Sequence, residues 1–324
     1  MGEPTTLRLR LTGYIMLGSF IVVTGGDSRY CPLIRELIAS LRVLKPAAEC
    51  PIGVIDAGLT AEQIAELKAL GTNVVTPPWP VSIPAHRLRN RIHLKANLAK
   101  LHLPTYFPGY DTVIWIDADA WVQDWEAVEM LRRGAALNRF AIVAQFGRFS
   151  ETELRLDWLF GRFARVRSIL FKNASRAGLT TAECRALATR PTLNAGAYAL
   201  KADAPHWEAF QRWQKRVLRK GRLFTSDQLA MAGAIYLDGL PVELLPEWCN
   251  YIGPWRFDPE RRELVEYYLP NRRLGIVHMA GEDAMRADPS VLRPVLDMQD
   301  RPHQLSLRHP AWKTAAAERR TEAV

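Results

Sequence analysis

Two carboxylates follow the most hydrophobic strand-like segment of the chain. Residues Thr112–Ile116 are largely apolar, and Asp117 and Asp119 come directly after them. In open α/β sheets, ligands gather at the carboxyl ends of strands. Two carboxylates buried there need a compensating charge, and their hard oxygen ligands suit Mg²⁺ or Mn²⁺. The segment therefore indicates a cation that binds a departing diphosphate, whereas the ordinary alternative is a strand that ends in two solvated aspartates.

The segments that precede this pair alternate between strand and helix. A capping-box pattern at Thr60 and Gln63 begins one of the helices, and Gly71 ends it. Alternation of this kind predicts a largely parallel sheet that is covered on both faces. We expect strands over residues 19–24, 51–55, 73–76 and 112–116, and helices over residues 32–44, 60–71 and 89–103.

The second half of the chain is more mixed. Residues 151–172 have the pattern of one long, amphipathic, basic helix. The wider stretch 148–190 is rich in arginines with Leu and Phe between them, a pattern compatible with peripheral contact with an anionic membrane and a lipid-linked acceptor, although an ordinary amphipathic helix is the favoured interpretation. A solvated basic helix face is the ordinary alternative. We expect further strands over residues 141–146, 197–200, 241–245 and 274–277, and helices over residues 204–219 and 226–234.

These elements predict one α/β domain with a mixed, mostly parallel sheet flanked by helices. Residues 1–15 differ in character from the rest and are expected to form a disordered lead. The folded domain would span residues 16–300, with a nucleotide-binding half over 16–135 and an acceptor half over 136–300. The polar tail, residues 301–324, is expected to fray.

The charge and cysteine content of the chain limit the kinds of partner and the cellular location that we expect. The chain of 324 residues has a formal net charge of +9, which favours nucleotide phosphates, nucleic acid or an anionic membrane surface. The basic residues are spread out and match no nucleic-acid motif, so we expect no nucleic-acid partner. The four cysteines form no C-x-x-C pair, which favours free thiols and a cytoplasmic location over structural zinc. No apolar run is long enough to span a bilayer, and the pattern of a signal peptide is missing.

Several short motifs follow one another in a recognisable order. The first two are Val22-Val23-Thr24-Gly25-Gly26 and Trp115-Ile116-Asp117-Ala118-Asp119-Ala120-Trp121-Val122. The later ones are Asn194-Ala195-Gly196, Asp227-Gln228, Leu245-Pro246-Glu247-Trp248-Cys249-Asn250-Tyr251 and His278-Met279-Ala280-Gly281. In this order, over roughly residues 19–285, they resemble the GT-A glycosyltransferases and in particular glycosyltransferase family 8.

The resemblance implies a single-domain, Rossmann-like GT-A fold and a glycosyltransferase activity. Enzymes of this kind transfer a hexose from a nucleotide-diphosphate sugar, here expected to be a UDP-sugar, to an acceptor hydroxyl with retention. The acceptor would be a carbohydrate, a lipid-linked molecule or a protein. The implied metal is Mn²⁺ or Mg²⁺, and its implied ligands are Asp117, Asp119 and His278, with Asp117 also a candidate contact for the ribose.

The resemblance also implies roles for residues around the metal. Asp227 and Gln228 would lie beside the anomeric carbon, with Gln228 on the reacting face of a retaining enzyme and Asp227 as the base of an inverting one. A helix start is the ordinary interpretation of Asp227, because Ser226 is a good N-cap. Other donor contacts would come from Thr24, Gly25, Gly26, Lys95 or Arg91, Asn194 and Gly196, and Trp248 and Trp255 are candidates for sugar stacking.

One motif departs from the family pattern. After His278-x-x-Gly281 the family has a lysine that contacts the diphosphate, whereas this chain has Glu282-Asp283-Ala284, and Arg286 is the candidate replacement. The missing lysine supports one alternative, a non-catalytic binding protein of GT-A fold. The other alternative is a haloacid dehalogenase-like phosphohydrolase, which also uses D-x-D after an apolar strand. In that class the motif comes early in the chain, whereas three predicted strands precede it here.

Overall fold

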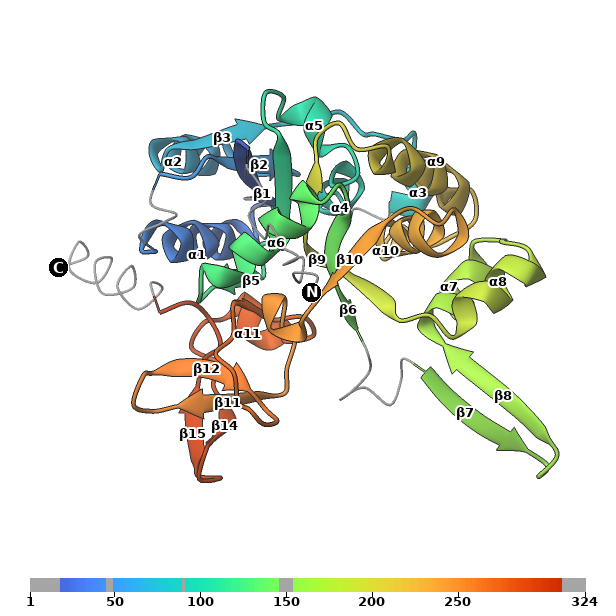
Figure 1. Ribbon diagram of the computed structural model, residues 1–324. Helices are drawn as coiled ribbons and strands as arrows, with labels where there is room; N and C mark the ends of the chain where they lie inside the picture. Colours follow the sequence, from blue (N-terminus) through green and yellow to red (C-terminus); the bar gives the residue numbers. More distant parts are fainter. Residues whose placement is uncertain (1–17, 45–48, 89–90, 146–153, 311–324) are drawn as a thin grey trace, which may run out of the picture.

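A seven-stranded sheet forms the centre of the computed structural model, which describes residues 18–44, 49–88, 91–145 and 154–310. The strand order is β10-β6-β9-β4-β1-β2-β3 (Figure 1). Strand β9 pairs antiparallel with β4 and β6, and the other pairs are parallel, which confirms the predicted mixed, mostly parallel sheet. The strands are β1 (Phe20–Gly26), β2 (Ile52–Asp56), β3 (Thr72–Val75), β4 (Thr112–Ile116), β6 (Phe140–Gln145), β9 (Thr192–Lys201) and β10 (Val242–Leu245).

Helices cover both faces of this sheet. Successive residues of β1 belong to opposite hydrophobic clusters, because side chains alternate across a strand: Val22 packs with one cluster, and Ile21 and Val23 with the other. The Val22 cluster is covered by α1 (Cys31–Arg42) and α6 (Glu126–Ala136). The opposite cluster is covered by α7 (Ile169–Arg176), α8 (Thr181–Ala188), α9 (His206–Leu218) and α10 (Ser226–Ala232).

The predicted capping box is confirmed at the start of α2 (Ala61–Ala69), where the Thr60 hydroxyl accepts from the Gln63 backbone and the Gln63 side chain accepts from the Thr60 N–H. Of the predicted helix over residues 89–103, residues 89–90 lie outside the described chain and the rest is interrupted. It forms α4 (Leu94–Ala99) and α5 (Leu103–Tyr106), which follows α3 (Ala85–Leu88). Pro104 lacks the N–H needed to continue α4, so it begins a new turn instead.

The predicted long helix over residues 151–172 is wrong. Residues 151–153 lie outside the described chain, and the segment that follows is an antiparallel hairpin of β7 (Leu154–Leu159) and β8 (Phe163–Ser168). Gly161 has a φ of 64° in the turn between the strands, a conformation that interrupts a helix. Helix α7 begins only after Ser168, whose hydroxyl accepts from the Phe171 N–H.

A smaller sheet completes the C-terminal part. Its order is β12 (Glu263–Glu266), β11 (Trp255–Asp258), β14 (Arg293–Asp297) and β15 (Pro302–Leu305). The expected fraying from residue 301 is therefore wrong for residues 301–310, and the expected domain end at residue 300 is too early. Because this end of the chain is polar in composition, the sequence did not indicate that β15 pairs with β14 or that Leu307 and Arg308 are buried.

Arg308 forms a buried ion pair with Glu36 of α1, and its guanidinium also donates to the backbone carbonyls of Met285 and Arg286. All four cysteines are free and buried. Within the described ranges, no helix is both long and apolar enough to cross a bilayer.

Candidate active site

A pocket of about 430 Å³ opens where β1 and β4 end, beside β9, which pairs antiparallel with β4. Its size lies within the range of small-molecule sites. The pocket brings together most of the residues singled out in the sequence, although they are far apart along the chain. Its lining includes Gly25, Gly26, Asp117, Asp119, Asn194, Gly196, Asp227, Gln228, His278 and Arg286.

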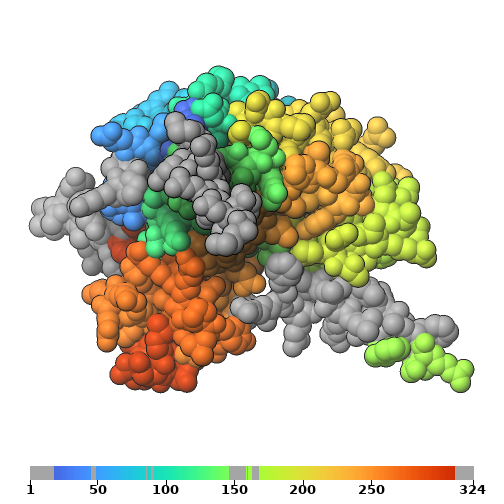
Figure 2. Space-filling view, in the orientation of Figure 1, coloured from blue at the N-terminus to red at the C-terminus, as the bar shows by residue number. Residues whose placement is uncertain are grey.

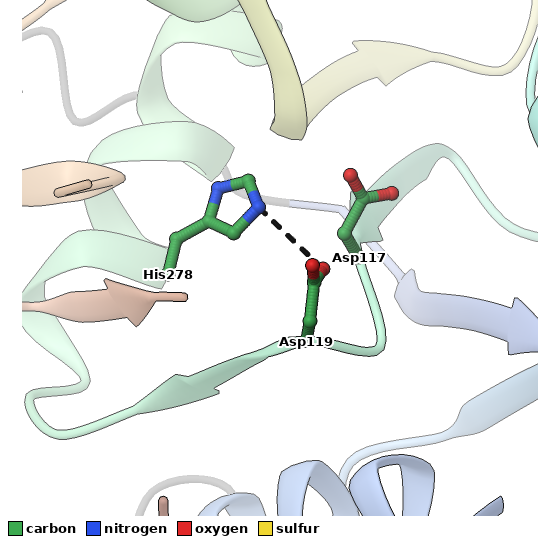
Figure 3. Close-up of side chains that lie close together, drawn as sticks. All are labelled: Asp117, Asp119 and His278. Carbon is green, nitrogen blue, oxygen red and sulfur yellow. Dashed lines mark ion pairs between the residues drawn. The ribbon is translucent and has the colours of Figure 1, made fainter. Parts of the chain in front are cut away.

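Asp117, Asp119 and His278 form a compact group in this pocket (Figure 3). Each offers one ligand atom, and these atoms all lie within 4.8 Å of one another. His278 Nε2 is 3.5 Å from Asp119 Oδ1, and His278 Nδ1 is 3.0 Å from Asn250 Oδ1. If Nδ1 carries the proton that Asn250 accepts, the lone pair of Nε2 faces the carboxylates. Two carboxylates and one imidazole therefore fit a divalent cation such as Mn²⁺.

The short pairing of β5 (Ala120–Val122) with β13 (Ile276–His278) brings His278 to the carboxylates. In its register, His278 lies opposite Ala120, one residue after Asp119, and the Met279 N–H donates to the Asp119 carbonyl at 2.9 Å. The two strands come from distant parts of the chain, yet they hold the imidazole next to the D-x-D turn.

Gly196 makes room for the imidazole. A Cβ at this position would lie 2.2 Å from His278 Cε1, which no side chain can tolerate. The Gly196 carbonyl also accepts from the Asp117 N–H at 2.7 Å. Gly25, by contrast, is close to the neighbouring strand, where a Cβ would lie 2.6 Å from Ile55 Cβ. The absent side chain of Gly196 thus leaves room for the His278 ring, and that of Gly25 allows close packing against β2.

Asp119 is buried and contacts both His278 and Arg286. Burial raises the pKa of its carboxyl, but the contacts with His278 and Arg286 outweigh this effect and hold the pKa well below its usual range. Burial lowers the pKa of His278, and Asp119 reverses this and raises it. Arg286, on α11 (Asp283–Ala287), pairs with Asp119 Oδ2 and with Asp283. Asp119 Oδ1 remains on the side of His278.

Lys100 is a pocket residue that the sequence interpretation missed. Its ammonium is buried and lies 3.1 Å from Asp117 Oδ1 and 2.9 Å from Asp227 Oδ2. Burial lowers the pKa of Lys100, but the two carboxylates outweigh burial and raise it above its usual value. Trp115 Nε1 also donates to Asp117 Oδ1 at 2.6 Å. The sequence did contain one indication of this role. Lys100 lies among the apolar residues Leu98, Ala99 and Leu101, where an unpaired charge is costly, so a buried partner could have been expected.

Comparisons with family models and with solved structures both give matches. Residues 21–131, about a third of the chain, match the family model described as "Glycosyl transferase family 8". The bifunctional glycosyltransferase WbbM in its apo form is similar to the chain, with a TM-score of 0.50 and 15% identity over 82% of this chain and 46% of that one. Both findings point to the same class of protein. The chain is a glycosyltransferase of the GT-A fold that resembles family 8 over residues 21–131.

Two more distant structures are similar to the glycosyltransferase. The galactosyltransferase LgtC, solved with donor and acceptor sugar analogues, has a TM-score of 0.47 and 15% identity over 81% of this chain and 87% of that one. The mannosyltransferase PcManGT from Pyrobaculum calidifontis, solved with GDP-Man and Mn²⁺, has a TM-score of 0.36 and 14% identity over 71% and 55%. A comparison with curated protein sequences gives no match.

Some of the expected contacts lie away from the pocket of the glycosyltransferase. Thr24 is buried, and its hydroxyl has no hydrogen-bond partner among the described residues, but it does not line the pocket. Lys95 and Arg91 do not line it either. Trp248 and Trp255 are buried in the hydrophobic core, which leaves no free ring face for sugar stacking in this structure. Core packing explains both tryptophans.

Several lining residues of the glycosyltransferase were not anticipated. They are Tyr30, His93, Asn97, Gln145, Phe224 and Thr225. Thr225 has a φ of 69°, an uncommon backbone conformation for this residue, directly before α10. No motif in the sequence marks these positions, because each is brought to the pocket by the fold.

Proposed function

We propose that the glycosyltransferase is metal-dependent and moves a hexose from a nucleotide-diphosphate sugar to an acceptor hydroxyl. The observation that carries the proposal is the convergence of Asp117, Asp119 and His278 within 4.8 Å on the wall of the pocket. A divalent cation held there, Mn²⁺ or Mg²⁺, supplies charge neutralisation to the departing diphosphate. Gly25 and Gly26 are the proposed nucleotide contacts, and Asn194 is proposed to face the donor sugar.

The surroundings of Asp227 support retention of anomeric configuration. A base that activates an acceptor must be free to take a proton. The Asp227 carboxylate is buried, and its Oδ2 lies 2.9 Å from the Lys100 ammonium, so this oxygen is already engaged in an ion pair. Gln228 also lines the pocket and is neutral. We therefore propose Gln228, rather than Asp227, as the residue beside the reacting face.

The proposed donor is a UDP-sugar, and the proposed acceptor is a carbohydrate, a lipid-linked molecule or a protein. The many basic residues of the chain favour such an anionic donor. A cytoplasmic location remains a prediction from the free thiols.

The decisive experiment measures binding of UDP- and GDP-sugars by calorimetry with and without Mn²⁺. We expect one donor to bind only when Mn²⁺ is present, and Asp119→Asn to abolish that binding. Asp300→Asn is the matched control, because it removes a carboxylate from an exposed ion pair with Arg256 on the smaller sheet. Donor binding by the wild type that is equal with and without Mn²⁺ would overturn the metal-dependent proposal.

A further inference from the structure

The tip of the β7–β8 hairpin exposes two aromatic side chains. Phe160 is 94% exposed and Trp158 is 67% exposed. In Figures 1 and 2 the tip stands clear of the body of the molecule, away from the central sheet and from the smaller C-terminal sheet. Contact between the hairpin and the body comes from α7 and α8 against β8. The aromatic rings of the tip therefore gain little burial from the rest of the described chain.

The backbone at the tip makes Phe160 an unexpected residue. The register pairs Leu159 with Phe163, which leaves Phe160, Gly161 and Arg162 as the turn. Phe160 has a φ of 53° and Gly161 has a φ of 64°. Glycine and asparagine suit this left-handed region, and a bulky aromatic is unfavourable there. Among the described residues, neither turn conformation nor burial favours Phe160, which points to a benefit from a partner that this part of the chain does not supply.

The charge of the hairpin indicates the kind of partner. Residues 154–168 contain Arg155, Arg162, Arg165 and Arg167 against a single acid, Asp157, and the whole chain carries a formal net charge of +9. Aromatic rings settle at the boundary between lipid headgroups and acyl chains, and arginines are attracted to anionic lipids. A specific protein interface needs roughly 800 Å² from each partner, which is large for a three-residue turn. A bilayer needs no shape-matched surface of that size.

From these observations we propose that the hairpin tip is a membrane-anchoring device, which inserts Phe160 and Trp158 into the interface of an anionic bilayer. Arg162 lies at the same turn and is exposed, so it contacts lipid phosphates as the rings enter. The anchor keeps the pocket near the bilayer surface. This inference concerns a surface separate from the pocket and does not rest on the proposed transfer reaction.

The test is flotation of the full chain with vesicles of phosphatidylcholine alone and of phosphatidylcholine mixed with phosphatidylglycerol. We expect wild type to float with the anionic vesicles at low salt and to stay behind with neutral vesicles. In the double variant Trp158→Thr/Phe160→Asn, partitioning should fall about tenfold or more, because both rings are removed. Threonine suits a strand and asparagine suits a positive φ, so this variant preserves the hairpin.

The control is Leu269→Ser, which removes an apolar side chain that is 85% exposed in the β11–β12 region. It should float as wild type does. Equal flotation of wild type and Trp158→Thr/Phe160→Asn would overturn the proposal, as would failure of wild type to float. A wild-type dimer in light scattering that the double variant abolishes would assign the tip to a second copy of the chain and would also overturn it. Mn²⁺-dependent donor binding should be unchanged in the double variant, which separates this outcome from that of the proposed function.

Discussion

Two groups of acidic side chains share the pocket wall and are neutralised differently. Asp117 and Asp227 both contact Lys100, whose side chain is only 3% exposed and whose ammonium also donates to the Ala195 carbonyl at 3.3 Å. Asp119 is paired with His278 and with Arg286, whose side chain is 20% exposed and reaches in from α11. Both cations line the pocket, but Lys100 is almost fully buried, whereas Arg286 is partly exposed.

This difference suggests that Lys100 neutralises its two carboxylates permanently, whereas Arg286 can be replaced at Asp119 by another cation. Removing Lys100 would leave the buried Asp227 carboxylate and the partly buried Asp117 carboxylate without their partner, which is strongly unfavourable. Arg286 also pairs with the exposed Asp283, so it can leave Asp119 and keep a partner and contact with water. We infer that a metal ion takes over the role of Arg286 at Asp119, whereas the ammonium of Lys100 stays in place.

The largest effect is expected from Lys100→Met. This change should lower the free energy of unfolding by about 3–5 kcal/mol, because it leaves the buried Asp227 carboxylate and the partly buried Asp117 carboxylate without a cation. Urea unfolding followed by circular dichroism measures it. The exposed Lys68→Met on α2 is the control and should change the value by about 0.5 kcal/mol or less. In Lys100→Met/Asp227→Asn part of the loss should return, and a loss below about 1 kcal/mol in the single variant would contradict permanent compensation.

Gly196→Ala should come next and should act on the metal site. The new Cβ would displace the His278 ring, so Mn²⁺ affinity should fall about 10–100-fold, the usual cost of misplacing a metal ligand through its supporting shell. Titration of Mn²⁺ followed by electron paramagnetic resonance measures it. Gly239→Ala is the control. A Cβ there meets nothing within 4 Å, so this change carries only the backbone cost of an alanine at a φ of 75° and does not displace a neighbouring side chain. Unchanged Mn²⁺ affinity would show that His278 is not a ligand.

Arg286→Gln should have a smaller effect of opposite sign. Removing the guanidinium frees Asp119 Oδ2, so Mn²⁺ affinity should rise by about fivefold, in line with a partly exposed ion pair. The same Mn²⁺ titration applies. Asp283→Asn is the control, because Arg286 keeps its contact with Asp119. If the affinity of Arg286→Gln falls instead, the arginine supports the metal site rather than competing with the metal.

Lys95→Gln should have the smallest effect. Because Lys95 does not line the pocket, the affinity for the nucleotide-diphosphate sugar should change by about twofold or less. Calorimetry with Mn²⁺ present measures this change. A larger loss would restore the phosphate contact that the sequence interpretation assigned to Lys95.

Local patterns predicted the framework of the pocket well. Strand β4 has the expected bounds, and Asp117 and Asp119 follow it as expected, because an apolar run and the carboxylates that end it are neighbours in sequence. His278 was found through its motif, although its place depends on the β5–β13 pairing. The family resemblance thus supplied a contact that periodicity alone cannot reveal.

The misses have physical causes. Lys100 contacts Asp227, which is 127 positions away, and Lys95 has the same charge on the same stretch of chain, so spacing could not separate them. The hairpin over β7 and β8 was mistaken for a helix because leucines and arginines fit both periods, and only the turn at Gly161 separates the two. The tail looked polar, yet Arg308 is buried because Glu36 neutralises it.

The Glu36–Arg308 pair gives the C-terminal end of the described chain a part in the geometry of the pocket. Arg308 donates to the carbonyls of Met285 and Arg286 and pairs with Glu36 of α1. It therefore links the segment that carries Arg286 to a helix near the other end of the chain. A protease cut or an early stop codon before residue 308 would leave every motif of the sequence intact and still loosen one wall of the site. Sequence integrity at the D-x-D turn is thus no guarantee of a working pocket, and mass spectrometry of the intact C-terminus belongs beside every activity measurement.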